Sequence, residues 1–260
     1  MDLGLTGKRA IITGGSKGIG LATATRMAME GAAVAIIGRR VDALEEAKLA
    51  IVAAAPGATV YVISADVATA AGTEAASQAA LAALGGCDIL VNNAGRSAVG
   101  PALGQDDEAW MADLELKLFG ALRMSRLCVP AMREAGGGRI VNVTAIQGKH
   151  PGAGSGPTAV SRAAGMALTK ILSKELASAN ITVNTVCIGL IKSEQIGRAA
   201  ERTGEGDIEA GFQRMGANVP LGRVGESHEA GDVIAFLCSE RASYINGVAL
   251  NIDGGMSSAL

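Results

Sequence analysis

The chain has 260 residues, a formal charge of −2 and a hydrophobic fraction of 49%, with only 2% aromatic residues. This length suffices for one large α/β domain or two small ones with a substantial core. A core poor in aromatics must be built from Ala, Val, Ile and Leu, which is typical of a parallel sheet covered by helices on both faces. Because charges of both signs are interspersed, we expect no nucleic-acid and no membrane partner.

Targeting and metal signals are absent from the sequence. No apolar stretch approaches the roughly 20 residues that cross a bilayer, and the first residues lack the apolar segment of a secretory signal. The four cysteines are widely spaced without a CxxC pair, and the chain has only two histidines. We therefore expect free thiols, a cytoplasmic location and no metal site.

Short apolar segments alternate with helix-length segments along the whole chain. The first strand, Ala10–Ile12, runs into a Gly-rich turn and a helix over about 19–29. Six more strands are expected at Ala33–Ile37, Val60–Ile63, Cys87–Val91, Arg139–Val143, Ile181–Val186 and Gly247–Ile252. This alternation predicts a Rossmann-type, doubly wound parallel α/β sheet of seven strands with helices on both faces, in one domain spanning 1–260.

Three segments stand out from the alternation. Long helices are expected over 107–127 and 158–178, and the second is rich in small apolar residues that let a neighbouring helix approach closely. Packing on the sheet explains such helices equally well. The polar, Gly-rich segment 194–218 is interpreted as an insertion over the ligand cleft, the alternative being a tolerated surface loop.

The first Gly-rich turn has the features of a dinucleotide site. Residues 13–20 read Thr-Gly-Gly-Ser-Lys-Gly-Ile-Gly. A pyrophosphate needs close backbone approach, which Gly14, Gly18 and Gly20 allow, and a helix N-terminus, which begins near Ile19. Such a turn alone is weak evidence, but here it lies between a strand and a helix, and Asn-Asn-Ala-Gly follows the fourth strand at 92–95. We therefore predict nucleotide binding.

The end of the second strand indicates which nucleotide is bound. NAD-binding sheets usually place an acid there, whereas this chain has Gly38 followed by Arg39 and Arg40. A guanidinium matches a ribose phosphate in charge and in fork geometry, and Ser16 and Lys17 approach the same place. We predict NADP(H) in preference to NAD(H). The alternative is that the two arginines are solvated charges at a strand end.

At these spacings the chain resembles the short-chain dehydrogenase/reductase family, whose marks are Thr-Gly-x3-Gly-x-Gly, Asn-Asn-Ala-Gly and Tyr-x3-Lys. The resemblance covers the chain from Gly7 to Gly255. It implies an oxidoreductase acting on a small carbonyl or alcohol. It also implies a homo-oligomer, dimer or tetramer, in which the helices at about 107–127 and 158–178 form the subunit interface.

The resemblance also implies further cofactor contacts. In the family, residues after the third strand flank the adenine, the Asn-Asn-Ala-Gly motif runs past the ribose, and a late loop meets the nicotinamide amide. The corresponding residues here are Asp66 and Val67, then Asn93, Ala94 and Gly95, then Ile191 and Ser193. In that late loop Ile188 replaces the family's Pro.

All four catalytic positions of the family carry a different residue in this chain. The Tyr position is Thr158, the Lys position is Arg162, the Ser position is Ala145 and the Asn position is Lys117. A Thr hydroxyl has no pKa that an adjacent cation could bring near neutrality, so Thr158 is a poor acid. Ala145 donates no hydrogen bond to an oxyanion. Arg162 can hold the nicotinamide ribose but cannot give up a proton.

Two titratable residues remain as candidate proton donors. A desolvated Lys117 beside Arg162 would have a depressed pKa and could serve as general acid, unless it reaches solvent or pairs with Glu115 or Asp113. His150 follows the fifth strand and titrates near neutral pH, unless it is simply a solvated loop side chain. Two functional classes therefore stay open: an oxidoreductase with a rearranged acid, or an NADP-binding sensor or partner subunit without turnover.

Overall fold

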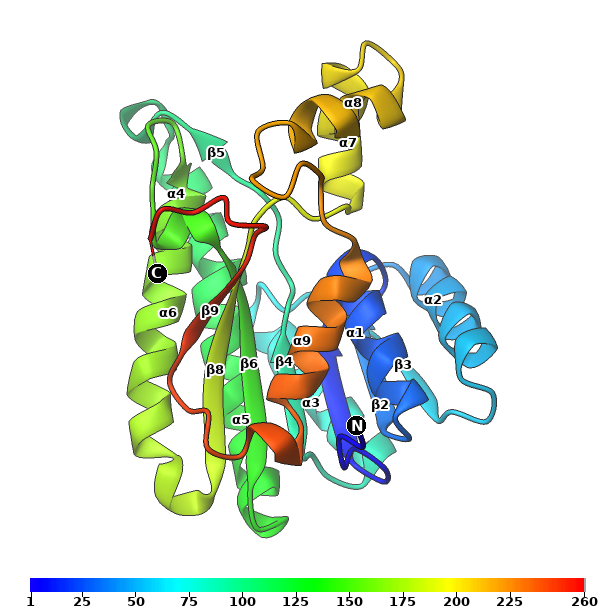
Figure 1. Ribbon diagram of the computed structural model, residues 1–260. Helices are drawn as coiled ribbons and strands as arrows, with labels where there is room; N and C mark the ends of the chain where they lie inside the picture. The colour runs from blue at the N-terminus through cyan, green and yellow to red at the C-terminus, as the bar shows by residue number, and fades with distance from the viewer. Residues whose placement is uncertain (260) are drawn as a thin grey trace.

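Seven parallel strands form the central sheet in the order β3-β2-β1-β4-β6-β8-β9. The computed structural model describes residues 1–259 (Figure 1). The strands span Arg9–Thr13 (β1), Ala33–Gly38 (β2), Val60–Ser64 (β3), Ile89–Asn92 (β4), Gly138–Ala145 (β6), Ile181–Ile188 (β8) and Ala249–Ile252 (β9). The predicted seven-stranded Rossmann-type sheet in a single domain is confirmed, with strand boundaries that differ by at most two residues.

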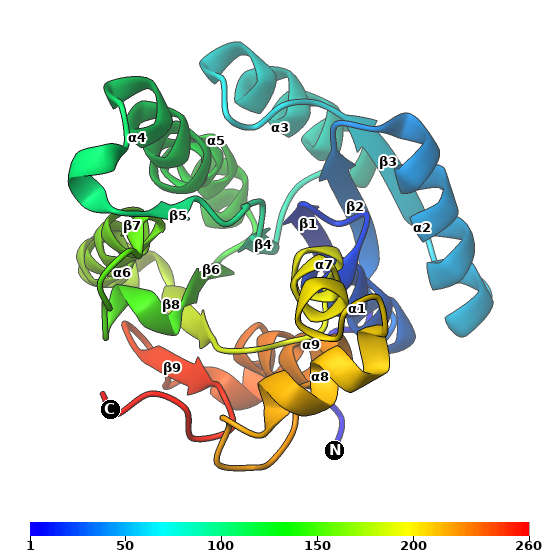
Figure 2. The ribbon, with the colours of Figure 1, turned by 90° about the horizontal axis from the view of Figure 1, so that it is seen from above.

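Helices cover both faces of the sheet, as the alternation predicts (Figure 2). One layer contains α1 (Gly18–Met29), α2 (Val41–Ala54) and α9 (Ser227–Leu237), and the other contains α3 (Ala70–Leu84), α5 (Gly120–Glu134) and α6 (Thr158–Glu175). Each layer of helices packs against one face of the sheet and forms an apolar core there. Met27, Leu44 and Ile234 belong to the first core, and Met124 and Met132 to the second. Among residues 1–259, no helix is long and apolar enough to span a bilayer.

The strand order reverses beside β1, because β4 lies on the side of β1 opposite to β2. In open α/β sheets a crevice forms outside the carboxyl ends of the strands at such a reversal, and ligands bind there. The two motifs at 13–20 and 92–95 come directly after β1 and β4. The topology therefore brings them together.

The long helix predicted over 107–127 is present, but one turn of it departs from α-helical geometry. It consists of α4 (Asp107–Leu114), a π-helical turn (Glu115–Phe119) and α5, which continues to Glu134. Just after the π turn, a Cβ on Gly120 would lie 2.8 Å from the carbonyl oxygen of Val67, so the helix passes close to the loop that follows β3. Single π turns inside helices are frequent at functional sites. This one carries Lys117 into the interior, where the residue is 8% exposed.

The segment 194–218 forms two helices rather than a loop, α7 (Glu194–Thr203) and α8 (Ile208–Gly216). They pack tightly, because a Cβ on Gly211 would lie 1.8 Å from the carbonyl oxygen of Ala200. The pair rises above the carboxyl end of the sheet (Figure 1). A short antiparallel pair, β5 (Val99–Gly100) with β7 (Gly156–Pro157), lies on the other side of the same opening. The sequence did not reveal this pair.

Candidate nucleotide-binding and active site

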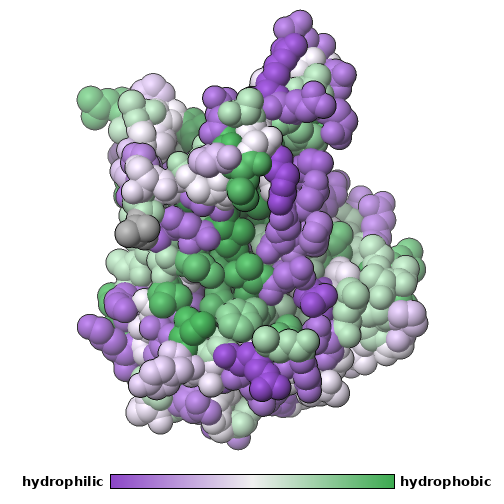
Figure 3. Space-filling view, viewed as in Figure 1, coloured by the Kyte–Doolittle hydropathy of each residue, from purple (hydrophilic) through white to green (hydrophobic). Residues whose placement is uncertain are grey.

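A cleft of about 970 Å³ opens at the carboxyl end of the sheet. In the space-filling view it appears as a hollow between the lobe that carries α4 and β5 and the lobe that carries α7 and α8 (Figure 3). Nearly all residues predicted to hold the cofactor line this cleft: Gly14, Ser16, Lys17, Gly18, Ile19, Arg39, Arg40, Asp66, Val67, Asn93, Ala94, Gly95, Arg162, Ile191 and Ser193. Its volume lies within the range of small-molecule and cofactor sites.

Gly20 is the exception, because it does not line the cleft. A Cβ at this position would lie 2.2 Å from the carbonyl oxygen of Gly14 and 2.5 Å from Nδ2 of Asn93. Gly20 therefore allows the first turn of α1 to pack against the Gly-rich turn. Its contribution to the site is the shape of that turn rather than a contact with a bound molecule.

Hydrogen bonds clamp the two nucleotide motifs together. Thr13 Oγ1 accepts from the backbone N–H groups of Asn93 and Ala94, both at 3.0 Å. Asn93 Nδ2 donates in return to the carbonyl oxygens of Thr13 and Gly14, also at 3.0 Å. Gly14 takes the left-handed conformation, with φ of 65°. The turn that follows β1 is thus fixed against the loop that follows β4.

The far end of the cleft is cationic. Arg39 and Arg40 follow β2, are exposed, and make no ion pair within residues 1–259. Lys17, in the Gly-rich turn, lies 3.2 Å from Glu194 at the start of α7. Guanidinium groups beside a helix N-terminus suit a phosphate. The residues at this end therefore fit an adenosine ribose that carries a phosphate.

At the opposite end, Lys117 is held in a buried network. Its ammonium donates to Asp113 Oδ1 at 2.5 Å and to Thr158 Oγ1 at 2.8 Å. The Lys117 and Asp113 side chains are 3% and 1% exposed. The second oxygen of Asp113 accepts from Ser161 Oγ at 2.6 Å. Of the two acids considered as partners for Lys117, Asp113 is the one that pairs with it.

The surroundings lower the pKa of Lys117 to about 8. Burial is the largest cause, and the charge of Arg162 adds to it. The hydrogen bond and the charge of Asp113 act in the opposite direction, and the charge of Arg96 lowers the pKa slightly further. Near neutral pH Lys117 is therefore an acid whose proton is available, because an ordinary lysine titrates two pKa units or more higher.

Thr158 lies between Lys117 and the cleft. Its Oγ1 accepts hydrogen bonds from Lys117 and from the backbone N–H of Ala98, both at 2.8 Å. A hydroxyl oxygen has two acceptor positions, so the hydroxyl hydrogen of Thr158 remains for donation. Within residues 1–259 that hydroxyl has no protein acceptor. Thr158 lines the cleft, which places this donor at the wall of the cleft.

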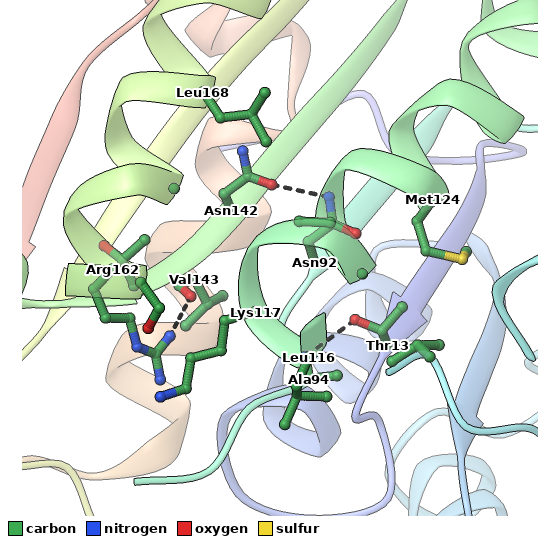
Figure 4. A pocket seen from close by; sticks show the side chains of 16 residues that line it. Thr13, Asn92, Ala94, Leu116, Lys117, Met124, Asn142, Val143, Arg162 and Leu168 are labelled. Carbon is green, nitrogen blue, oxygen red and sulfur yellow. Dashed lines mark hydrogen bonds between the residues drawn. The ribbon is translucent and has the colours of Figure 1, made fainter. Parts of the chain in front are cut away.

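Arg162, on α6, lines the cleft, and its side chain lies beside that of Lys117 (Figure 4). Its guanidinium donates to the carbonyl oxygen of Val143 at 2.6 Å, while its buried Nε has no hydrogen-bond partner among the described residues. A Cβ on Gly95 would lie 3.2 Å from the other terminal nitrogen of Arg162. The Arg162 guanidinium thus packs directly against Gly95. Ala145 contributes only an apolar wall nearby.

The comparisons with known proteins agree with this geometry. A family model described as "Enoyl-(Acyl carrier protein) reductase" matches residues 14–257. The chain is 36% identical over 260 residues to dehydrogenase/reductase SDR family member 4 of Oryctolagus cuniculus, covering 98% of this chain and 96% of the relative. The protein belongs to the short-chain dehydrogenase/reductase family. It is also 34% identical over 253 residues to nodulation protein G of Rhizobium sp. (strain N33), covering 97% and 98% of the two chains.

Solved structures of this dehydrogenase/reductase family include close structural matches. L-Sorbose reductase from Gluconobacter frateurii, complexed with NADPH and L-sorbose, superposes with a TM-score of 0.96 at 37% identity over 100% of both chains. Levodione reductase gives a TM-score of 0.91 at 28% identity, covering 98% of this chain and 99% of that one. The chain therefore shares the fold of these reductases over nearly its full length.

His150 does not take part in the site. The side chain is exposed, its Nδ1 lies 3.1 Å from Ser258 Oγ, and it is outside the cleft lining. Sequence reasoning also missed Ser161 and gave Asp113 only as an alternative partner. The spacing of four residues between Asp113 and Lys117 was the available signal, because helical residues four apart are neighbours. That spacing alone does not show that the pair faces inward.

The buried ion pair generates the first prediction. Replacing Lys117 by Met leaves Asp113 charged and unpaired in the interior, so Lys117→Met should destabilise the protein by about 3–5 kcal/mol. Urea unfolding measures this change. The double variant Asp113→Leu/Lys117→Met should recover most of the loss, because both charges are then removed together. An equal loss in the single and the double variant would contradict the ion pair.

Proposed function

We propose that this protein is an NADP(H)-dependent oxidoreductase of a small carbonyl or alcohol, in which Lys117 supplies the proton through Thr158. The observation that carries the proposal is the continuous path from the Lys117 ammonium to the Thr158 hydroxyl at the cleft wall, with Nζ–Oγ1 at 2.8 Å. NADPH, when bound, supplies a hydride to the carbonyl carbon. The residues of the chain must supply the proton for the oxygen.

The protein side of the step conserves charge and atoms. The Thr158 hydroxyl gives its proton to the carbonyl oxygen as that oxygen becomes an alcohol. At the same time the Thr158 oxygen receives a proton from the ammonium of Lys117, which becomes a neutral amine. Thr158 therefore does not need an acidic pKa of its own, because it never holds a full negative charge. Lys117, with a pKa of about 8, sets the driving force for the transfer.

The neighbouring residues of the site have positioning roles in this proposal. Asp113 holds the ammonium against Thr158 and balances its charge, and Ser161 fixes the carboxylate. Arg162 remains charged and suits the hydroxyls of the nicotinamide ribose with the N–H groups that Val143 does not use. No group replaces the hydroxyl that is lost at Ala145. We therefore expect slower turnover than an intact oxyanion site would give.

The cationic end of the cleft predicts a cofactor preference. Arg39→Ala should weaken NADPH binding roughly 10- to 100-fold, the loss of one charge-assisted hydrogen bond, and should leave NADH binding nearly unchanged. Fluorescence titration with both cofactors measures this. Arg133→Ala, which removes an exposed arginine outside the cleft lining, is the matched control. Equal weakening of both cofactors would overturn the NADP(H) assignment.

The relay also predicts a pH dependence. Reduction requires the ammonium form of Lys117, so its rate should be constant below pH 8 and fall about tenfold per pH unit above it. Alcohol oxidation requires the neutral amine of Lys117, so its rate should rise with pH up to about pH 8 and stay constant above it. Asp113→Asn removes a charge that raises the Lys117 pKa, so both limbs should move to lower pH. The measurement is the pH profile of kcat/KM in each direction.

Two controls decide between turnover and binding alone. Lys117→Gln should abolish reduction while it keeps NADPH affinity, whereas Lys174→Met, which changes an exposed lysine of α6, should alter neither. An unchanged rate in Lys117→Gln removes Lys117 from the mechanism. If a broad panel of aldehydes and ketones shows no turnover although NADPH binds, the alternative holds, and the protein is a cofactor-binding sensor or partner subunit.

We also propose that the protein is a homo-oligomer through the outer faces of α4 and α6. Met111, Val160 and Ile171 are large apolar residues there that are 51%, 50% and 53% exposed. Ala163 and Ala167 lie between the last two on the exposed face of α6. Small residues between larger ones allow a second copy of this helix to pack closely.

The expected mass in solution is a multiple of 26.0 kDa. Ile171→Asp should shift light scattering towards the monomer, because a charge in the apolar interface would be desolvated. Leu49→Asp is the matched control, because Leu49 is 71% exposed on α2, away from the proposed interface. A monomeric wild-type protein, or equal effects of the two variants, would contradict this assembly.

A further inference from the structure

We infer that the cleft contains a subsite for an anionic group of the substrate, formed by Arg96, so that the preferred substrate is a carboxylated or phosphorylated carbonyl compound. This substrate class rests on the proposed function for turnover, but the subsite itself can be tested by binding alone. Neither the fold nor the cofactor requires such a group. The inference rests on the position of Arg96, its charge and its surroundings.

Arg96 lies next to the proposed proton donor. It follows Gly95 directly and lines the cleft together with Ser97 and Thr158. Two residues later, Ala98 is fastened to Thr158 in both directions: its N–H donates to Thr158 Oγ1 at 2.8 Å, and its carbonyl oxygen accepts from the Thr158 N–H at 3.1 Å. Because two residues span at most about 7 Å, the Cα atom of Arg96 lies within that distance of the Cα atom of Ala98, which is the residue bonded to Thr158.

The charge of Arg96 is uncompensated. The side chain is exposed and makes no ion pair or hydrogen bond within the described residues 1–259. Arg39 and Arg40 are likewise without an ion pair at the far end of the cleft, whereas Lys17 is paired with Glu194 and the buried Lys117 with Asp113. Glu115, which also lines the cleft, is paired with Arg123 at 2.6 Å.

Positive charge gathers at the catalytic end as well as at the far end of the cleft. Arg96 and Arg162 both act on Lys117, whose pKa is lowered mainly by burial, then by Arg162, and to a smaller extent by Arg96. One buried carboxylate, Asp113, is paired with Lys117. Low-dielectric walls focus such a field into the cleft and raise the local concentration of anions. A neutral substrate would leave this field unused, whereas an anion would neutralise it.

The distance between Thr158 and Arg96 limits the size of the substrate. A carbonyl oxygen that accepts from Thr158 and an anionic oxygen that accepts from Arg96 must belong to one small molecule. A carboxylate or phosphate a few bonds from the carbonyl meets this condition, because arginine binds both groups through parallel N–H donors. Arg39 and Arg40, which suit the phosphate of the cofactor, follow β2 and are not part of this subsite.

The test uses two pairs of probes that differ in charge: acetoacetate with methyl acetoacetate, and dihydroxyacetone phosphate with dihydroxyacetone. The charged member of at least one pair should have the higher kcat/KM, and the pair that shows it identifies carboxylate or phosphate. Arg96→Met should lower kcat/KM for that charged probe roughly 10- to 100-fold and leave its neutral partner within about twofold. Arg96→Lys should retain part of the preference, because it keeps the charge but not the fork.

A matched control and a binding assay complete the design. Arg126→Met removes an exposed arginine of α5 outside the cleft lining and should change nothing. If no probe turns over, equilibrium dialysis of acetoacetate and dihydroxyacetone phosphate against the NADPH-loaded protein decides the question. Binding that Arg96→Met abolishes would keep the subsite and reject the proposed function. Equal kcat/KM within both pairs, equal losses for charged and neutral probes, or no binding to wild type would overturn the subsite.

Discussion

The catalytic end of this protein depends on the burial of one ammonium group beside one carboxylate. Lys117 and Asp113 are nearly inaccessible, and either charge alone would carry a penalty of several kcal/mol there. The pair is possible because the π turn directs Lys117 inward, and because Ser161 and Thr158, both on α6, provide the remaining hydrogen-bond partners. Helix geometry, charge balance and the position of the Thr158 hydroxyl are thus linked through a single contact.

The nucleotide end is organised differently, since backbone rather than side-chain chemistry dominates it. Glycines at the turn after β1 permit close approach, and the Thr13–Asn93 hydrogen bonds fix that turn against the loop after β4. These features need only the right backbone conformation. They are independent of the side chains at the other end of the cleft. The same scaffold therefore combines a backbone-built turn at one end with the polar network of Lys117, Asp113, Thr158 and Ser161 at the other.

The sequence predicted the sheet well because buried parallel strands leave continuous apolar runs, and because the two glycine motifs mark their ends. It also predicted that Lys117, Thr158 and Arg162 occupy one place, through the family spacing. It could not predict the π turn in the helix over 107–127, because a π turn changes hydrogen bonding without a distinct residue signature. For the same reason it could not decide between Asp113 and Glu115 as the partner of Lys117. It placed His150 near the cleft only by the loop it belongs to, whereas the local path of the chain turns that side chain towards Ser258.

In the mechanism that we propose, Arg162 and Lys117 divide two tasks that one lysine performs in the family pattern. The guanidinium beneath Gly95 stays charged over the whole physiological range, whereas the ammonium of Lys117 titrates near pH 8. The group that suits the ribose and the group that supplies protons are therefore electrostatically coupled but chemically independent. In alkaline surroundings such a protein would stop reducing its substrate while it still retained its nucleotide. It would then act as a reservoir of bound cofactor rather than as a catalyst.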